Sequence, residues 1–388
     1  MTRVVVVTHE ASRTGAPRMA LRVLRALQDV AEERIVVVRW PGPLVPEFRS
    51  ASDRLRLEPL RRLRVSLRSG RATRRLAVRV EEHAARRVLS DERPSLVYAN
   101  TVKSACYIRP ALELGVPVVL HCHEDDSMVE DVLARYRLDG VYDRVWLVAC
   151  SAASASRLAE ATGVDVGAVT VITEAVDVDD VLANAAVPSP GWARSTGMVV
   201  GGCGTVDYRK GIDQWLRVAA QVRDALGPTC PRFEWIGRVA DESYPALARE
   251  LGLGGIVEFV GERTNPYPML AALDIVTVTS RHDAFPLVVL EAMALGRPIV
   301  AFDVGGIREQ LGDTGRLVPG GDVDAMSAAL LQLIADEPSR RFLASAAAER
   351  VNALFSIQQF RAAVAAVARA ALAARSSGAA DAGGATTG

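Results

Sequence analysis

The sequence predicts an α/β fold made of two doubly wound, Rossmann-like domains. Short apolar runs alternate with amphipathic stretches along nearly the whole chain, a pattern typical of parallel sheets covered by helices on both faces. A length of 388 residues exceeds one ordinary core and favours about two domains. A break rich in proline divides the apolar runs into two groups, at Val187, Pro188, Ser189, Pro190 and Gly191. We therefore expect one sheet on each side of this break.

The expected strands are short runs rich in valine, isoleucine and other apolar residues. In the first half they cover residues 3–7, 34–39, 96–99, 117–121, 145–149 and 169–172. In the second half they cover residues 198–203, 233–236, 257–260, 275–279 and 299–302. Because open α/β sheets bind ligands beyond the carboxyl ends of their strands, the loops that directly follow these runs are the candidates for function.

The same break sets the domain boundaries. It places an N-terminal domain at residues 1–187 and a C-terminal domain at residues 188–355. Residues 356–375 are alanine-rich with apolar residues at helical spacing, and we expect them to form a final helix that completes the N-terminal domain. Residues 376–388 are small and polar, which favours a disordered tail.

The composition excludes several classes of protein. With 49% hydrophobic and 24% charged residues, the chain matches a soluble globular protein and not a disordered or collagen-like one. Its 46 basic and 46 acidic residues balance, so attraction to nucleic acid or membrane would have to come from a local patch. The 5 cysteines form no C-x-x-C pair, and neither a signal peptide nor a membrane-spanning stretch is visible. A reduced, cytoplasmic enzyme is the expectation.

The most informative segment runs from Ser280 to Gly296. An expected strand ends before it, and a helix begins near Pro286, a residue suited to the first helical turn. The N–H groups and the positive dipole end of such a helix are suited to a phosphate or diphosphate. Asp283 in the loop and Glu291 in the helix would flank that site, with carboxylates able to accept hydrogen bonds from separate sugar rings. The alternative is an exposed aspartate and a capping or salt-bridged glutamate.

This segment resembles the E-x7-E signature of the retaining glycosyltransferases called family 4, which have the two-Rossmann GT-B fold with its domains facing across a cleft. Asp283 stands where that family usually has its first glutamate, which contacts hydroxyls of the donor sugar. Glu291 matches the second glutamate, which binds the nucleotide ribose. The resemblance implies that Phe285, Leu287 and Val288 surround the leaving diphosphate.

A second loop, residues 201–211, resembles the family's G-R-x-x-x-x-K-G phosphate loop. Lys210 falls on the family lysine, and Gly204 belongs to the same turn. Thr205 stands at the usual arginine position, so Arg209 is the expected substitute donor to a departing diphosphate. The loop lacks the third glycine of G-x-G-x-x-G after Gly202, which disfavours a dinucleotide-dependent oxidoreductase.

Two loops of the first half carry further candidates. After the first expected strand, the family's loop is glycine-rich and lies between acceptor and donor diphosphate, so the resemblance places Gly15 there. Arg13 adds a charge contact or lies on the surface. His123 and Glu124 match the family's His-Asp or His-Glu step, and the resemblance implies that His123 reaches the transferred sugar. Lys103, after the run 96–99, is a candidate for acceptor contact or a surface cation.

A metal site is an alternative for the histidines. His121 and His123 lie two positions apart on an expected strand and precede three acids. The resembling family works without a metal, because helix termini and basic side chains neutralise the diphosphate. The two D-x-D spacings, which begin at Asp177 and Asp322, are not placed to hold a metal-bound nucleotide sugar.

The donor base is not specified by the sequence. In the resembling family the nucleobase lies between two loops that here contain Arg238 and Arg263, which leaves a UDP-sugar or a GDP-sugar as the co-substrate. No further cofactor is expected. Glu309, in a turn similar to the family's G-G-x-x-E, is expected to brace its loop.

From Arg54 to Arg79 the chain has a basic run interrupted by one acid, Glu58, with leucines interleaved. This composition suits peripheral contact with an anionic membrane or with a phosphorylated acceptor. The alternative is a solvated arginine-rich surface. Nucleic-acid binding is disfavoured because no aromatic residues interleave for base stacking.

Together these patterns predict a metal-independent glycosyltransferase that moves a sugar from a nucleotide sugar to the hydroxyl of a glycolipid, polysaccharide or small-molecule acceptor, with retention of configuration. His123, Asp283, Lys210 and Arg209 are the expected catalytic residues. Two other readings stay open: a nucleotide-sugar epimerase or hydrolase, and an inactive sugar-nucleotide-binding module, which the departures at Asp283 and Thr205 keep in view.

Overall fold

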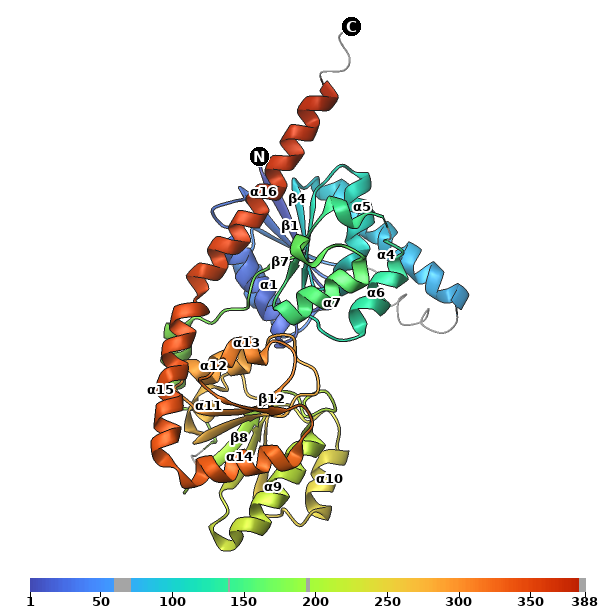
Figure 1. The fold of residues 1–388 in the computed structure, drawn as a ribbon. Coiled ribbons are helices and arrows are strands. Elements are labelled where there is room, and N and C mark those ends of the chain that lie inside the picture. The colour runs from blue at the N-terminus through green and yellow to red at the C-terminus, as the bar shows by residue number, and fades with distance from the viewer. Residues whose placement is uncertain (59–70, 139, 193–195, 384–388) are drawn as a thin grey trace. The chain divides into compact units, whose positions relative to one another are not determined.

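The computed structural model describes residues 1–58, 71–138, 140–192 and 196–383. It divides into two compact units, each containing one sheet with helices on both faces (Figure 1). Unit 1 comprises Met1–Thr173 together with Gln358–Gly388, and unit 2 comprises Glu174–Ile357. The α/β architecture expected from the alternating pattern is confirmed.

The sheet of unit 1 has seven parallel strands in the order β3-β2-β1-β4-β5-β6-β7. Its centre is β1, whose residues Val4 to Val7 have no solvent exposure, as expected for a parallel strand covered on both faces. The strands are β1 (Arg3–Thr8), β2 (Glu33–Val38), β3 (Arg54–Leu57), β4 (Leu96–Asn100), β5 (Val118–Cys122), β6 (Val145–Ala149) and β7 (Thr170–Val171).

Helices connect these strands. The first, α1, is amphipathic and buries Met19, Val23 and Leu24, which recur at the helical spacing. The helices of this part of the chain are α1 (Gly15–Ala26), α2 (Val45–Ala51), α4 (Arg71–Glu92), α5 (Ile108–Glu113), α6 (Met128–Tyr136) and α7 (Ala152–Thr162), with 3₁₀ turns at Val102–Tyr107, Tyr142–Arg144 and Val166–Ala168. The last helix, α16 (Ile357–Gly383), returns to unit 1, where Arg375 donates to the Pro94 carbonyl at 3.1 Å.

Unit 2 repeats the design with a six-stranded parallel sheet in the order β10-β9-β8-β11-β12-β13. Its strands are β8 (Val199–Cys203), β9 (Arg232–Ile236), β10 (Val257–Gly261), β11 (Ile275–Val278), β12 (Ile299–Asp303) and β13 (Arg316–Pro319). Its helices are α8 (Val178–Ala185), α9 (Ile212–Leu226), α10 (Ser243–Glu250), α11 (Tyr267–Ala272), α12 (Leu287–Ala294), α13 (Ile307–Leu311), α14 (Val323–Ala335) and α15 (Glu337–Leu354), with a 3₁₀ turn at Gly227–Thr229.

The core of unit 2 is organised around Trp215 on α9, which is fully buried. Its indole packs edge-on against Trp235 and Phe233 of β9, with ring centroids 5.1 and 5.8 Å away. The indole N–H donates to the Thr277 hydroxyl of β11 at 3.0 Å. This bond joins α9 to β11. The loop before α9 and the loop after β11 carry the site residues.

Three expectations need correction. The unit boundary lies at Thr173/Glu174 and not at 187/188, because α8 packs against α11 and α12 of unit 2. The helix α16 extends past residue 375 to Gly383, where the sequence predicted a tail, and residues 384–388 lie outside the described part. The edge strands β3 and β13 were not expected.

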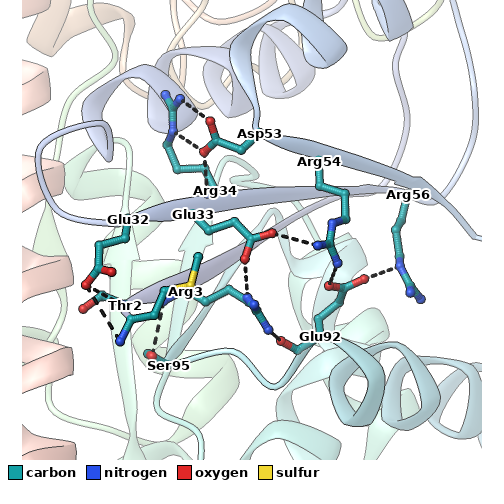
Figure 2. Close-up of polar contacts among 11 residues, drawn as sticks. Thr2, Arg3, Glu32, Glu33, Arg34, Asp53, Arg54, Arg56, Glu92 and Ser95 are labelled. Carbon is teal, nitrogen blue, oxygen red and sulfur yellow. Dashed lines mark hydrogen bonds and ion pairs between the residues drawn. The ribbon is translucent and has the colours of Figure 1, made fainter.

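The start of the basic run is tied into the sheet by ion pairs (Figure 2). The carboxylate of Glu92, which has no solvent exposure, binds Arg54 at 2.7 Å and also pairs with Arg56. Arg54 bridges to Glu33 at 3.1 Å, and Glu33 binds Arg3 at 2.5 Å. Acids distant in the sequence therefore neutralise the first two arginines of the run, whereas residues 59–70 lie outside the described part of the chain.

Among the described helices, none combines the length and the apolar character that crossing a bilayer requires.

Candidate active site

The candidate donor site lies at the carboxyl edge of the unit 2 sheet. The strand order changes direction between β8 and β11, which are neighbours in the sheet although not in sequence. In doubly wound sheets such a reversal leaves a crevice at the carboxyl ends of the two strands. The loops that follow them, residues 204–211 and 279–286, are the two that carry the expected phosphate-binding residues.

Backbone contacts hold these two loops together in register. The N–H of Arg281 donates to the Arg209 carbonyl at 2.8 Å, and the hydroxyl of Thr279 donates to the Lys210 carbonyl at 3.0 Å. The amide of Lys210 is bound in turn by the Asp207 carboxylate at 2.9 Å. The backbone of Arg209 and Lys210 is therefore held through both carbonyls and through the Lys210 N–H group.

The side chains of Lys210 and Arg209 converge on one carboxylate oxygen of Asp283. The Lys210 ammonium lies 2.6 Å from it, the Arg209 guanidinium 3.2 Å, and the Ser280 hydroxyl 3.2 Å. Burial alone would raise the pKa of Asp283, but the charges of Lys210 and Arg209 outweigh it and hold the pKa below its ordinary value. The structure thus brings together three of the four expected catalytic residues as an ionised cluster.

Two glycines allow the loop after β8 to lie against its neighbour. Gly204 has a φ of +148°, and a side chain there would meet the aliphatic part of Lys210 at 3.0 Å. Gly237, directly after β9, has a φ of +150°, and a Cβ on it would lie 1.9 Å from the Gly204 carbonyl oxygen. That carbonyl accepts a hydrogen bond from the Trp235 indole at 2.9 Å. Only glycine fits this close backbone approach.

The helix α12 begins directly after Pro286, as the sequence predicts. Leu287 and Val288 are its first two residues, whose N–H groups have no carbonyl partner within the helix. Phe285 is buried and packs edge-on against Phe355, with centroids 5.7 Å apart. The Pro286 carbonyl accepts from the buried Gln310 amide at 3.0 Å. The contacts with Phe355 and Gln310 therefore hold the start of α12 in place, with its first amides at the carboxyl edge of the sheet.

Glu291 lies in the middle of α12, where every residue is buried, and is itself 4% exposed. The hydroxyl of Tyr267 on α11 donates to its Oε1 atom at 3.1 Å. A buried carboxylate requires such donors. Glu291 is therefore buried and hydrogen-bonded in the middle of its helix, and it does not cap a helix end.

The two arginines expected near a nucleobase follow the next strands of the sheet. Arg238 comes after β9, and its carbonyl accepts the Val206 amide at 2.9 Å, so its backbone joins the phosphate loop. Arg263 follows β10 and is half-buried. Both lie on the side of the sheet that runs outward from β8, through β9 to β10.

In unit 1 the corresponding reversal lies between β1 and β4. The loop after β1 folds around Glu10, whose carboxylate accepts from Ser12 at 2.6 Å and pairs with His9 at 3.5 Å. The bond with His9, assisted by Ser12 and opposed by burial, lowers the pKa of Glu10 to about 2. Gly15 is the first residue of α1, with no atoms near the position of a side chain. The sequence placed Gly15 in the loop before the helix, whereas the structure makes it the first helical residue.

His123 lies directly after β5 and is oriented by its neighbours. Its Nε2 atom lies 3.0 Å from the Oδ1 atom of Asn100, at the end of β4, and Asn100 donates through Nδ2 to the Ala16 carbonyl at 2.9 Å. The Glu124 carboxylate accepts the His123 amide at 3.0 Å. A fully buried amide thus connects His123 to the first turn of α1.

The two histidines considered as metal ligands lie with their rings 4.2 Å apart. The Nδ1 atom of His121 pairs with the Tyr98 hydroxyl at 2.8 Å, and Nε2 of His123 pairs with Asn100. Burial, followed by the nearby His123, lowers the pKa of His121 well below its ordinary value. One ring nitrogen of each histidine therefore has a protein partner, and a shared cation would have to bind through the others.

Sequence reasoning missed several residues that support the site. Ser280 binds Asp283, Tyr267 binds Glu291, and Arg281 binds Asp213 in the first turn of α9 through two hydrogen bonds. The positions of Ser280 and Arg281 directly after β11 were the available signal. The pairing of Tyr267 with Glu291 depends on how α11 packs beside α12, which no local spacing reveals.

Comparison with known proteins identifies both halves of the chain. Residues 13–180 match the family model described as Glycosyltransferase Family 4, and residues 195–336 match that described as Glycosyl transferases group 1. The D-inositol 3-phosphate glycosyltransferase of Thermomonospora curvata is 41% identical over 120 residues, which are 29% of this chain and 27% of that protein. The lipopolysaccharide core biosynthesis mannosyltransferase LpsB of Rhizobium meliloti is 35% identical over 182 residues, which are 43% and 50% of the two chains. This chain therefore matches half or less of the length of these curated relatives.

A solved structure has the same fold over nearly the whole chain. The crystal structure of HepE from Anabaena, in complex with UDP and glucose, superposes with a TM-score of 0.74 at 20% sequence identity, and covers 94% of this chain and 98% of its own. Together with the two family matches, which cover most of the sequence, this establishes that the chain has the GT-B fold and belongs to the group 1, family 4 glycosyltransferases.

Proposed function

We propose that this protein transfers a sugar from a nucleotide sugar to an acceptor hydroxyl, with retention of anomeric configuration and without a metal ion. The observation that carries the proposal is the convergence of Lys210 and Arg209 on Asp283 at the strand reversal of unit 2, beside the start of α12. Two cations and a helix N-terminus at one point form a site for a nucleoside diphosphate. The relatives that match are named as glycosyltransferases, which supports the same chemistry.

Different residues bind different parts of the donor. The diphosphate lies against Lys210, Arg209 and the first amides of α12, while the buried Glu291 accepts hydrogen bonds from ribose hydroxyls. Asp283 accepts hydrogen bonds from hydroxyls of the donor sugar. Glu291 already accepts a hydrogen bond from Tyr267, and a ribose hydroxyl would be an additional donor to the same carboxylate.

The reaction breaks the bond between the anomeric carbon and the diphosphate oxygen and forms a bond from that carbon to the acceptor oxygen on the same face. The acceptor proton passes to the departing phosphate oxygen, so a nucleoside diphosphate is released. Lys210 and Arg209 stabilise the charge that develops on it, and this replaces the role that a metal ion has in other transferases. Asp283 is held by two cations and a hydroxyl, which suits orientation of the sugar and not covalent attack.

The donor is a UDP-sugar or a GDP-sugar, and the acceptor carries a hydroxyl. The protein acts in the cytoplasm, and the basic run that begins at Arg54 contacts an anionic membrane or a phosphorylated acceptor. Arg54 and Arg56 take no part in that contact because their charges are paired with Glu92 and its neighbours. The remainder of the run has to supply it.

The test is turnover of UDP-, GDP- and ADP-sugars by the purified protein, measured as released nucleotide with and without EDTA and with and without acceptor. We expect one nucleotide to be released in an acceptor-dependent reaction that EDTA leaves unchanged. Lys210→Ala and Glu291→Ala should each abolish turnover while the protein stays folded, whereas Arg217→Ala, an exposed cation on α9, should not. Turnover that needs no acceptor would contradict transfer and identify a hydrolase or epimerase.

A further inference from the structure

The loop that carries Arg209 and Lys210 is held by a third cation that does not join their cluster. Arg281 lies two residues before Asp283, directly after the β11 segment, and its side chain is 18% exposed. Its N–H binds the Arg209 carbonyl at 2.8 Å, so its backbone already contacts the cationic loop. The side chain makes further contacts to the same loop and to the helix that follows it.

The guanidinium group of Arg281 makes contacts that all lie between residues 208 and 213. Its two Nη atoms bind the two carboxylate oxygens of Asp213 at 2.9 and 2.7 Å, which is a bidentate pair. One of them also donates to the Tyr208 carbonyl at 2.7 Å. The guanidinium carbon lies 3.9 Å above the Tyr208 ring, within the range of a cation–π contact.

These contacts surround the two cations in sequence. Tyr208 precedes Arg209, and Asp213 opens α9 just after Lys210. Three successive carbonyls, those of Tyr208, Arg209 and Lys210, accept hydrogen bonds from the Arg281 side chain, the Arg281 backbone and the Thr279 hydroxyl respectively. Each of these donors belongs to the segment after β11. The segment after β11 therefore fixes the position of residues 208–210 through one hydrogen bond to each carbonyl.

The charges divide into two separate sets. Arg209 and Lys210 reach Asp283, whereas the Nη atoms of Arg281 are engaged by Asp213 and the Tyr208 carbonyl. A guanidinium held by a bidentate carboxylate is poorly placed to leave it for a ligand. We infer that Arg281 is a positioning residue, which acts on a bound diphosphate only through Arg209 and Lys210; this inference rests on the proposed function.

Arginine is required for this role because its donors form a rigid planar fork. The fork binds both oxygens of Asp213 and a carbonyl at the same time, and its face stacks on an aromatic ring. A lysine would keep the charge but could satisfy only part of this set. A glutamine would lose the charge and the bidentate pair together.

The first measurement is hydrogen–deuterium exchange of the full-length protein, which needs no ligand. In Arg281→Gln, peptides that cover residues 205–212 should exchange at least severalfold faster, and in Arg281→Lys they should show an intermediate rate. The matched control is Arg232→Gln, which breaks the exposed Arg232–Glu258 pair at the opposite end of β9 and should leave these peptides unchanged. Unchanged exchange in Arg281→Gln would overturn the positioning role whether or not the protein is a glycosyltransferase.

The second measurement is the Kd of whichever of UDP, GDP and ADP binds best to the wild-type protein, by calorimetry. We expect Arg281→Gln to weaken nucleotide binding about tenfold, because the charged hydrogen bonds that hold the loop of Arg209 and Lys210 in place are lost. In the Lys210→Ala background the same change should cost less, because one of the two residues through which Arg281 acts is gone. Factors that multiply in the double variant would instead identify Arg281 as a direct ligand and overturn the inference. If none of the three nucleotides binds the wild type, the proposed function fails, while the exchange experiment still decides the role of Arg281.

Discussion

The Lys210 ammonium and the Asp283 carboxylate lie 2.6 Å apart, and both side chains are nearly buried, at 11% and 12% exposure. Arg209 shares the same oxygen at 3.2 Å. In the absence of substrate, Asp283 is therefore the internal counter-ion of the two cations assigned to the diphosphate. An incoming diphosphate has to share those cations with it, and this competition sets the sign of the effect expected at position 283.

Replacing Asp283 with asparagine should separate nucleotide binding from turnover. Without the carboxylate, Lys210 and Arg209 have no internal counter-charge, so a nucleoside diphosphate should bind about tenfold more tightly, given the strength of short ion pairs in a partly buried site. Turnover of the nucleotide sugar should fall, because asparagine is a weaker acceptor for sugar hydroxyls. Calorimetry with UDP and GDP, together with released nucleotide, measures the two effects.

The matched control for that variant is Asp224→Asn. Asp224 is 69% exposed and pairs with Arg223 near the end of α9, away from the loop that carries Lys210. Neither affinity nor turnover should change in it. Weaker nucleotide binding in Asp283→Asn would mean that the carboxylate organises the cations for the ligand and does not compete with it.

Asn100 determines the tautomer of His123. Its Nδ2 atom donates to the Ala16 carbonyl, so Oδ1 faces His123 and the proton between them must lie on Nε2 of the histidine. Nitrogen NMR of labelled histidine, with the signal assigned from His123→Gln, should show the Nε2–H tautomer in the neutral ring. A ring that carries its proton on Nδ1 would contradict this assignment.

Asn100→Leu should remove that preference and destabilise the protein by about 1–3 kcal/mol, because the partly buried Ala16 carbonyl loses its donor. Urea unfolding measures the loss. Asn352→Leu is the comparison: it removes an amide-to-carbonyl bond of similar length, 2.8 Å, from an exposed position on α15 and should cost only a few tenths of a kcal/mol.

The sequence pattern located the central strands of both sheets because their residues are apolar on both faces. The edge strands β3 and β13, which are exposed at several positions, lack this signal. β3 alternates arginine with leucine, and its arginines are neutralised by Glu33, Asp91 and Glu92, which lie far away in the chain. The unit boundary was misplaced for a related reason: prolines mark where a chain turns, but the packing of α8 on α11 and α12 decides to which unit it belongs.

The candidate site was predictable as a set of loops but not as a set of pairs. Their positions after expected strands, together with the resemblance to the family's phosphate loop and E-x7-E signature, pointed to Lys210, Asp283 and Glu291. Spacing could not show that Asp283 neutralises Lys210, because that contact depends on β8 and β11 being neighbours in the sheet. The sequence did not single out Arg281, because its contacts with Tyr208 and Asp213 depend on the same packing.

Glu10 should make the free energy of unfolding depend on pH in the acidic range. The hydrogen bond with His9, with help from Ser12, lowers its pKa from 4.5 to about 2 in the folded state. A depressed folded-state pKa contributes stability above the unfolded value, and this contribution is lost as the pH falls from about 4.5 towards 2. The difference in unfolding free energy between wild type and Glu10→Gln should therefore be present at pH 6 and shrink below pH 4.5. A difference that stays constant down to pH 3 would contradict this, and Glu160→Gln, at a side chain 69% exposed, gives the baseline.

Gly237→Ala should disrupt both the stability of unit 2 and the diphosphate site. A Cβ at this position would lie 1.9 Å from the Gly204 carbonyl oxygen, and the φ of +150° is unfavourable for alanine. Because the clashing atom is backbone, Gly204 has to move, and it lies against the side chain of Lys210. We expect a loss of about 2 kcal/mol or more in the free energy of unfolding, from strain and overpacking together.

The same movement should also weaken binding of a nucleoside diphosphate, because Gly204 lies against the side chain of Lys210. Trp235 would lose its hydrogen bond to the displaced Gly204 carbonyl as well. Gly254→Ala provides the control, since a Cβ there meets no atom within 4 Å and its backbone lies outside the left-handed region. It should change neither the urea midpoint nor the nucleotide affinity. If Gly237→Ala unfolds at the wild-type midpoint but no longer binds nucleotide, the loop after β8 can shift without cost to the sheet, and the glycine at 237 serves the position of Lys210 and not the stability of the fold.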